Sequence, residues 1–395
     1  MNRIWMKRIC AAGAATALLC TTHGGVLHAG VIAEGRALLR GRDAGFVAGV
    51  VLVDGAGVHT STNGSDERVI PWHRVAKVEG PLAGEASGYL LQGEELWRAL
   101  ARLDRGDLPS AEVLLEGLDD GLASTPGPTA EAIWMGLMRC RLERGAQTGA
   151  AAAWLMWRSV RPQDQPVEST PGEASDRTPA SGGLVPAIPP VWVNVPSVAV
   201  LASGGMESWK LGSLHTGEVV SELSAWYLRA AQGACDREAA GWPEVSADAD
   251  VMLVAAMVKA QYGDDRERLS SRESLRAIMA QRTEPWVEVW ARVAVGRSLL
   301  KESDAETRRL GVVELLHIPS RLEAVVPYLT GVAMAEAAAG LRRLGDLAGG
   351  SVIREELLRR YSGHPAVEWS MVRDWPQTAP QRVKEEVEAE ELPRP

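Results

Sequence analysis

The stretch that decides the fold is EAIWMGLMRCRLERGAQTGAAAAWLMWRSVRP, residues 131–162. Apolar residues recur every three or four positions on both sides of Gly145, which predicts two amphipathic helices joined by a tight turn. A proline at the end of the stretch stops the second helix. Ala150 leaves room for the helices to cross closely, and we expect two large side chains to be buried between them, Trp134 and Trp154.

The spacing of this hairpin resembles a tetratricopeptide repeat. The resemblance rests on Trp134-x-x-Leu137-Met138-x-x-Arg141, the turn at Gly145, Ala150-x-x-x-Trp154, Trp157 and Pro162. Two positions depart from the family pattern, because Met138 stands where a small residue is usual and Arg141 where an aromatic residue is usual. The resemblance implies an array of helical hairpins with a concave face that binds a protein or peptide.

Two further hairpins match the pattern more loosely. One has Trp97, Leu100 and Ala101 before a Gly106-Asp107 turn and Ala111 and Leu115 after it. The other has Ala338 before a Leu344-Gly345-Asp346 turn and Gly350 and Leu357 after it, and its ending resembles units of bacterial envelope proteins. A single hairpin cannot bury its own apolar face, so such units are expected to stack. We therefore predict a mainly α fold, an α-solenoid of degenerate repeats; a generic α-solenoid and an irregular helical domain are the alternatives.

Residues 31–85 have a different pattern, in which β-branched residues alternate with small ones between turn signals such as DGAG. This predicts three to five short strands, enough for a small barrel or curled sheet. The run IPWHRV, residues 70–75, resembles the closing segment of SH3-like and Sm-like barrels. We expect a small N-terminal β module.

The chain begins with basic residues followed by a short apolar run, the order found in a secretory signal peptide over residues 1–29. Cleavage after Ala29 would make this an exported, periplasmic or cell-envelope protein. Lipid attachment at Cys20, the only membrane link that we expect, and an uncleaved N-terminal anchor are the alternatives. Cys140 and Cys235 would remain after cleavage, which allows one disulfide or two buried thiols.

Composition defines the remaining boundaries. Residues 88–160 and 215–375 carry helical periodicity, and residues 161–195 are rich in Pro, Ser and Gly, which predicts a disordered linker between them. Residues 376–395 form an acidic tail. The formal net charge of −9 gives no reason to expect nucleic acid as a partner.

No pattern typical of a catalytic, metal or cofactor site occurs in the sequence, so we expect neither an enzyme nor a bound cofactor. The predicted function is an exported scaffold or adaptor that binds a protein or peptide. A structural solenoid subunit without a groove is the alternative, and an enzyme with an unrecognised site comes third. If the repeat resemblance holds, the groove residues are Met135, Arg139, Leu142 and Arg342.

Overall fold

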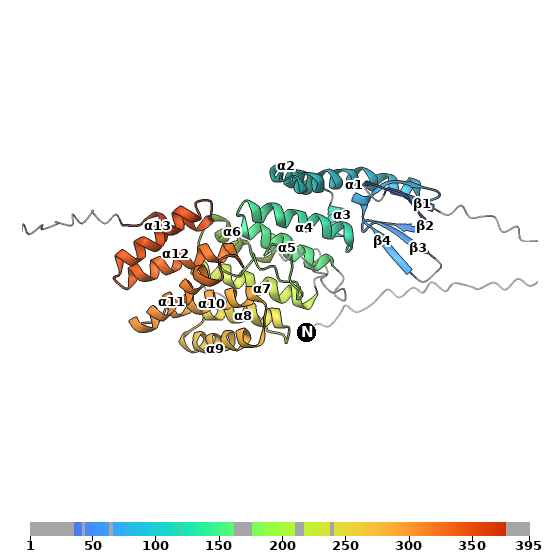
Figure 1. Ribbon diagram of the computed structural model, residues 1–395. Helices are drawn as coiled ribbons and strands as arrows, with labels where there is room; N and C mark the ends of the chain where they lie inside the picture. Colours follow the sequence, from blue (N-terminus) through green and yellow to red (C-terminus); the bar gives the residue numbers. More distant parts are fainter. Residues whose placement is uncertain are drawn as a thin grey trace, which may run out of the picture.

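The computed structural model describes residues 35–41, 44–62, 66–118, 120–161, 176–209, 217–237 and 241–376. The predicted signal peptide with Cys20, the first part of the predicted linker and nearly all of the acidic tail lie outside these ranges. The described chain is mainly helical, with a small antiparallel sheet at its N-terminal end (Figure 1). The predicted fold class is therefore confirmed.

Five strands form the sheet in the order β4-β3-β2-β1-β5, and every neighbouring pair is antiparallel. A short 3₁₀ helix, η2 (Trp72–Arg74), joins the two edge strands. Residues that face the helices are buried, whereas several on the other face are exposed. The strands are β1 (Gly35–Leu39), β2 (Phe46–Val53), β3 (Val58–Thr62), β4 (Asp66–Ile70) and β5 (Val75–Glu79).

The sheet is joined to the helices through Trp72, which is fully buried and stacks on Tyr89 with ring centroids 5.0 Å apart. The Trp72 indole donates to the Asp54 carbonyl at 2.7 Å, and its backbone N–H donates to the hydroxyl of Thr129 at 3.1 Å. That hydroxyl donates in turn to the Ala56 carbonyl at 2.6 Å. These bonds satisfy buried polar groups on both sides of the contact, so the β module is packed as part of the helical core.

The three predicted hairpins are present. They are α1 (Ala83–Asp104) with α2 (Leu108–Glu116), α4 (Pro128–Glu143) with α5 (Gln147–Val160), and α12 (Pro327–Arg343) with α13 (Leu347–Arg360). Between them lie α3 (Asp120–Ser124), α6 (Pro196–Gly204), η3 (Gly205–Trp209), α7 (Glu218–Ala234), α8 (Ala249–Tyr262), α9 (Asp265–Gln281), α10 (Pro285–Leu299) and α11 (Ala305–Arg321); η5 (Pro365–Glu368) and α14 (Ser370–Arg373) follow. Most consecutive helices pack side by side, which is consistent with a solenoid.

The three hairpins share one turn geometry. Gly106, Gly145 and Gly345 have φ of +78°, +74° and +88°, a region that glycine enters without a steric penalty. In each turn the residue after the glycine donates its N–H to a carbonyl five residues earlier, which closes the helix end in a Schellman motif. The end of α7 repeats this bond with Asp236 at φ +50° in place of glycine.

Aligning the hairpins on their glycines corrects one sequence assignment. The buried small residue seven positions before Gly106 is Ala99, matching Ala338 before Gly345, whereas Ala101 is only partly buried. Trp97 leaves 44% of its surface exposed, so it does not anchor the first hairpin. A periodic run of leucines and alanines allows both alignments, and only the packing distinguishes them.

The predicted linker is wrong over its second half. Residues 184–192 are buried in the core, with Leu184 at 0% and Trp192 at 3% exposure. This stretch forms neither helix nor strand, yet it runs between α5, α7 and α10. Its prolines and glycines set an irregular backbone, while its apolar side chains enter the core. Residues 162–175, the first half, lie outside the described residues.

Candidate functional site

The predicted groove residues do not form one surface. Leu142 is buried at 8% exposure and Met135 is half-buried, whereas Arg139, on the same helix, is exposed. Arg342 lies on α12, where its guanidinium sits 5.0 Å from the ring centroid of Trp375. The sequence pattern of one hairpin cannot show which of its faces a neighbouring hairpin covers.

A large hollow lies on another face of α4. It has a volume of about 650 Å³ and is enclosed by α2, α3, α4, α5 and η3. We call it the hollow; its lining includes Ile133, Trp134, Leu137, Ala152, Met156 and Trp209. Trp134 is thus not buried between α4 and α5 as expected, since its indole donates to the Ala123 carbonyl of α3 at 2.7 Å.

One edge of the hollow is polar but electrically balanced. The Arg141 guanidinium contacts Glu116 at 2.9 Å and Glu112 at 3.3 Å, and it donates to the Gly149 carbonyl at 3.1 Å. Burial pushes the pKa of Glu112 upward, but hydrogen bonds and charge from Arg144 and Arg141 outweigh it and leave that pKa lowered. The Glu112 carboxylate is therefore ionised at neutral pH. Arg141 is already paired with carboxylates, so the site favours an apolar ligand over a charged one.

A second candidate site, inside the helical array, is occupied by a segment of the chain itself. Residues 183–192, here the interior segment, pass through the centre of the helical array and accept hydrogen bonds from its side chains. Trp154 of α5 donates to the Gly183 carbonyl at 2.9 Å, and Trp290 of α10 donates to the Pro186 carbonyl at 2.8 Å. Trp154 is therefore fully buried, as predicted, but its partner is this segment.

One further helix, α7, and a second residue of α10 also bind the interior segment. The Tyr227 hydroxyl of α7 donates to the Ile188 carbonyl, and the Tyr227 carbonyl accepts from the Trp192 indole at 3.0 Å. Full burial raises the pKa of Tyr227 well above its ordinary value, so the hydroxyl keeps its proton as a donor. Arg297 of α10 reaches the Trp192 carbonyl at 3.5 Å.

Arg297 also forms a buried ion pair with Glu336 of α12, with 3.1 Å between Nε and Oε1. Both side chains are almost inaccessible, at 7% and 11% side-chain exposure. A buried charge is tolerated only with a partner, so these residues fix α10 against α12 next to the interior segment.

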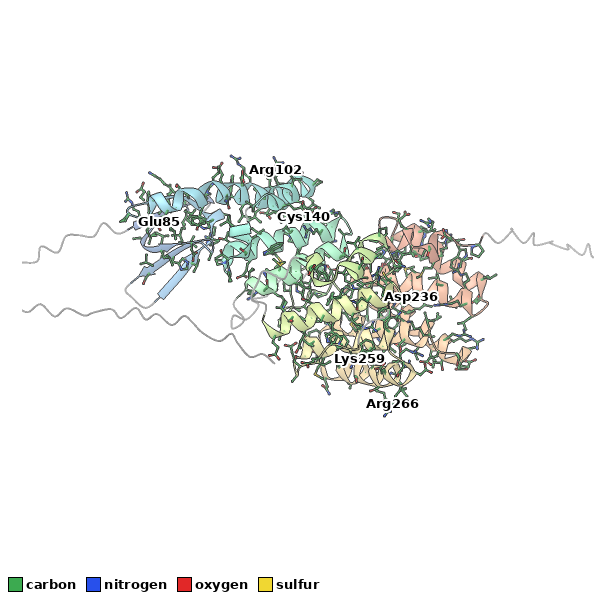
Figure 2. The ribbon with its side chains drawn as sticks, turned by 180° about the vertical axis from the view of Figure 1, so that it is seen from behind. Glu85, Arg102, Cys140, Asp236, Lys259 and Arg266 are labelled. Carbon is green, nitrogen blue, oxygen red and sulfur yellow. The ribbon has the colours of Figure 1, made fainter. Side chains whose placement is uncertain are left out.

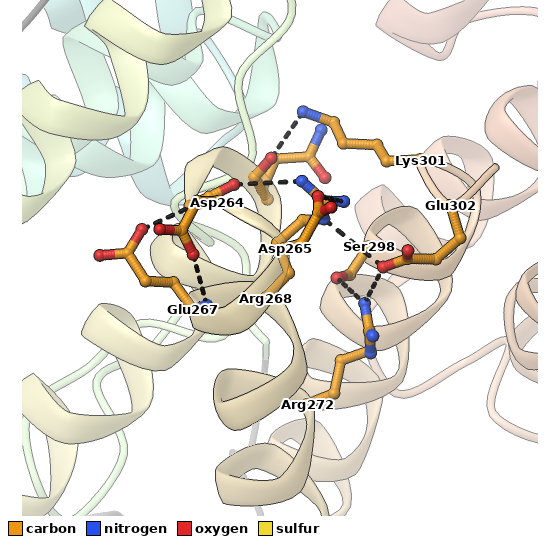
Figure 3. Close-up of polar contacts among 10 residues, drawn as sticks. Asp264, Asp265, Glu267, Arg268, Arg272, Ser298, Lys301 and Glu302 are labelled. Carbon is orange, nitrogen blue, oxygen red and sulfur yellow. Dashed lines mark hydrogen bonds and ion pairs between the residues drawn. The ribbon is translucent and has the colours of Figure 1, made fainter.

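Other charged clusters have structural roles. In Figure 3, Asp264 and Glu267 form a reciprocal capping box at the start of α9. Arg272 joins α9 to the end of α10 through Ser298 at 3.0 Å and Glu302 at 2.7 Å (Figure 3). These bonds hold α9 against the end of α10, so the cluster stabilises helix packing.

His364 has both ring nitrogens engaged. Nδ1 accepts from the Ala366 N–H at 3.0 Å, and Nε2 lies 2.9 Å from the Tyr328 carbonyl, which only a protonated nitrogen can satisfy. Burial lowers the pKa of the His364 imidazole. The ring is therefore a neutral structural link between α12 and η5.

The described residues hold no group of three or more His, Cys, Asp or Glu side chains that could bind a metal ion. Cys140 and Cys235 are free thiols; Figure 2 labels Cys140 and Asp236, the residue after Cys235, in separate parts of the array. In the described part of the chain, each helix is too short or too polar to span a bilayer.

Comparisons with known proteins identify no relative. No family model, no curated protein and no solved structure matches this chain significantly.

Proposed function

We propose that this chain is an exported scaffold or adaptor of the cell envelope that binds an apolar segment of another protein through its helical hairpins. The hollow is the observation that supports this proposal most strongly. It joins two neighbouring hairpins, and its walls combine Trp134, Met156 and Trp209. Aromatic and methionine side chains provide large, adaptable contact area, as binding surfaces require.

The chemistry of the hollow limits what it would bind. The floor is apolar, and the Arg141 pairs neutralise the polar edge. A charged ligand would have to break those ion pairs, and the free energy lost with them would exceed the free energy gained from the new contact. An apolar side chain would instead displace water from the hollow, at a gain of about 25 cal/mol for each Å² removed from water. We therefore propose a partner that inserts one or two large apolar side chains.

Site-specific photo-crosslinking tests this proposal in cells that express the full chain. Ala152 lines the hollow and is partly exposed, so a photo-reactive residue there should give a discrete protein adduct. The matched control is position 310 on α11, where Leu310 is 59% exposed and does not line the hollow. Mass spectrometry identifies the adduct and also determines the mature N-terminus. Equal labelling at both positions would count against a specific site.

The second candidate function is a structural assembly subunit without a peptide groove. It is favoured by the contact between the turn of α4–α5 and η5, since a side chain added at Gly145 would lie 3.1 Å from Pro365. This contact brings the second hairpin against the C-terminal end of the array. Crosslinks from position 152 to another copy of this chain would favour the subunit over the adaptor.

A further inference from the structure

The interior segment satisfies its hydrogen bonds in the manner of a bound peptide. Four of its seven N–H groups donate to carbonyls of the same part of the chain: Gly183 to Ala180, Ala187 to Asp176, Ile188 to Val185, and Val191 to Pro189. Three further residues, Pro186, Pro189 and Pro190, have no N–H to pair. The hydrogen bonds from the helices to the backbone of the segment are made to its carbonyls.

The surrounding helices supply donors at four of its carbonyls. Indole N–H groups serve Gly183 and Pro186, the Tyr227 hydroxyl serves Ile188, and the Arg297 guanidinium serves Trp192. These donors come from α5, α7 and α10, which lie between positions 147 and 299 of the sequence but meet around one short peptide. Aromatic-lined grooves also bind proline-rich peptides in other proteins.

We propose that the interior of the helical array is a peptide-binding groove that holds residues 183–192 as a ligand in cis, and that a partner's segment of the same chemistry binds there. That chemistry is an apolar, proline-containing peptide with a turn at residues 185–188, recognised through its carbonyls. Because the helices recognise backbone carbonyls, peptides with different side chains can bind. A peptide that lacks the prolines has extra N–H groups, and these would be buried without acceptors, so such a peptide is excluded. This site is distinct from the hollow, so each can fail without the other.

The interior segment is part of the same chain, so it competes with any added peptide at a high effective concentration. The test therefore begins with a substitution that weakens the binding of the interior segment. Ile188 is 1% exposed, and Ile188→Asp in the full chain places a carboxylate in the groove. A synthetic peptide copying residues 181–194 is then titrated into this variant by calorimetry, with the melting temperature followed in parallel. We expect saturable binding and a rise in melting temperature that approaches the wild-type value.

Three comparisons make the result specific. A peptide that carries Ile188→Asp should bind the Ile188→Asp chain at least tenfold more weakly than the original peptide does. The original peptide should also bind the wild-type chain at least tenfold more weakly than it binds the Ile188→Asp chain. Trp290→Phe in the Ile188→Asp chain removes the donor to Pro186 and should weaken binding several-fold while the aromatic wall remains.

If the Ile188→Asp chain does not fold, the same titration is done with Ile188→Ala in the full chain. This substitution removes contacts without adding a charge. A folded variant that binds no peptide, or binds both peptides equally, would overturn the proposal. The hollow is tested independently, since crosslinking from position 152 does not require the interior segment to move.

Discussion

The indole of Trp290 donates to the carbonyl of Pro186 at 2.8 Å, across 104 residues of sequence. With Trp154 and Tyr227 it makes the interior segment the centre of the fold, because three helices contact the same few carbonyls. A segment that forms no regular structure thus organises the helices around it. The stability of the array should depend on these donors more than on any single hairpin.

Trp154 tests that dependence. Trp154→Ala should lower the free energy of unfolding by about 3–5 kcal/mol through a cavity in the core. Trp154→Phe keeps most of the burial but leaves the Gly183 carbonyl unpaired, so we expect a loss of about 1–3 kcal/mol. Urea unfolding followed by circular dichroism measures both. The control is Trp97→Ala, at a tryptophan with 44% of its surface exposed, which should lower the free energy of unfolding clearly less than Trp154→Ala.

The parts of this fold that sequence predicts are the local ones. The hairpin of α4 and α5 follows from apolar periodicity around Gly145, and the sheet follows from β-branched alternation between turns. Each of these signals lies within a few tens of residues. Helix boundaries, turn glycines and the change from sheet to helices could therefore be predicted.

The buried segment could not be predicted in the same way, because residues 176–195 contain the prolines and glycines that are typical of a linker. Their burial depends on Trp154, Tyr227 and Trp290, donors that are distant in sequence. The groove assignment failed for a similar reason. Whether Arg139 or Arg141 faces a hollow depends on how the neighbouring hairpin packs, and a single hairpin does not contain that information.

The shared turn geometry predicts opposite effects at two equivalent positions. Gly345→Ala should destabilise by about 1–2 kcal/mol, because φ of +88° is strained for a side chain even though the space around it is empty. Asp236→Gly should stabilise by about 0.5–1 kcal/mol, since Asp236 already occupies the left-handed region at φ +50°. Chemical denaturation of the two variants gives both values. A destabilising Asp236→Gly would mean that the aspartate side chain, not the backbone, fixes this turn.

Removing one partner of the ion pair between Arg297 and Glu336 should lower the free energy of unfolding strongly, whereas replacing both partners by apolar residues should change it little. Glu336→Leu leaves a buried guanidinium without its carboxylate, and we expect a loss of about 3–5 kcal/mol. Arg297→Met with Glu336→Leu removes both charges, and stability should return to within about 1 kcal/mol of wild type. Thermal and urea unfolding of the single and double variants complete the cycle. If the double variant were as unstable as the single one, the bond from Arg297 to the Trp192 carbonyl would matter more than the ion pair.

The packing of the second hairpin separates a buried position from an exposed one. Ala150 is fully buried on α5, so Ala150→Leu adds three carbons to a filled space and should cost about 1–3 kcal/mol. Arg139→Ala, on the exposed side of α4, should leave the free energy of unfolding within about 0.5 kcal/mol of wild type. Thermal unfolding of the two variants measures the contrast, and the reverse order would show that the helix faces are assigned wrongly.

His73, in η2 at the base of the sheet, should make the protein sensitive to mild acid. Burial, with a smaller contribution from the charge of Arg74, lowers the pKa of His73 from 6.5 to about 4. A lowered pKa means that the unfolded chain binds the proton more readily, so the stability from neutral His73 is complete above pH 6.5 and is lost as the pH falls toward 4. Between pH 7 and pH 5 this corresponds to a loss of about 2 kcal/mol in the free energy of unfolding.

Urea unfolding at both pH values should show this loss in wild type and a clearly smaller loss in His73→Gln, which cannot be protonated. If the two proteins lost stability equally, the acid sensitivity would belong to other groups, such as His364, whose pKa burial also lowers.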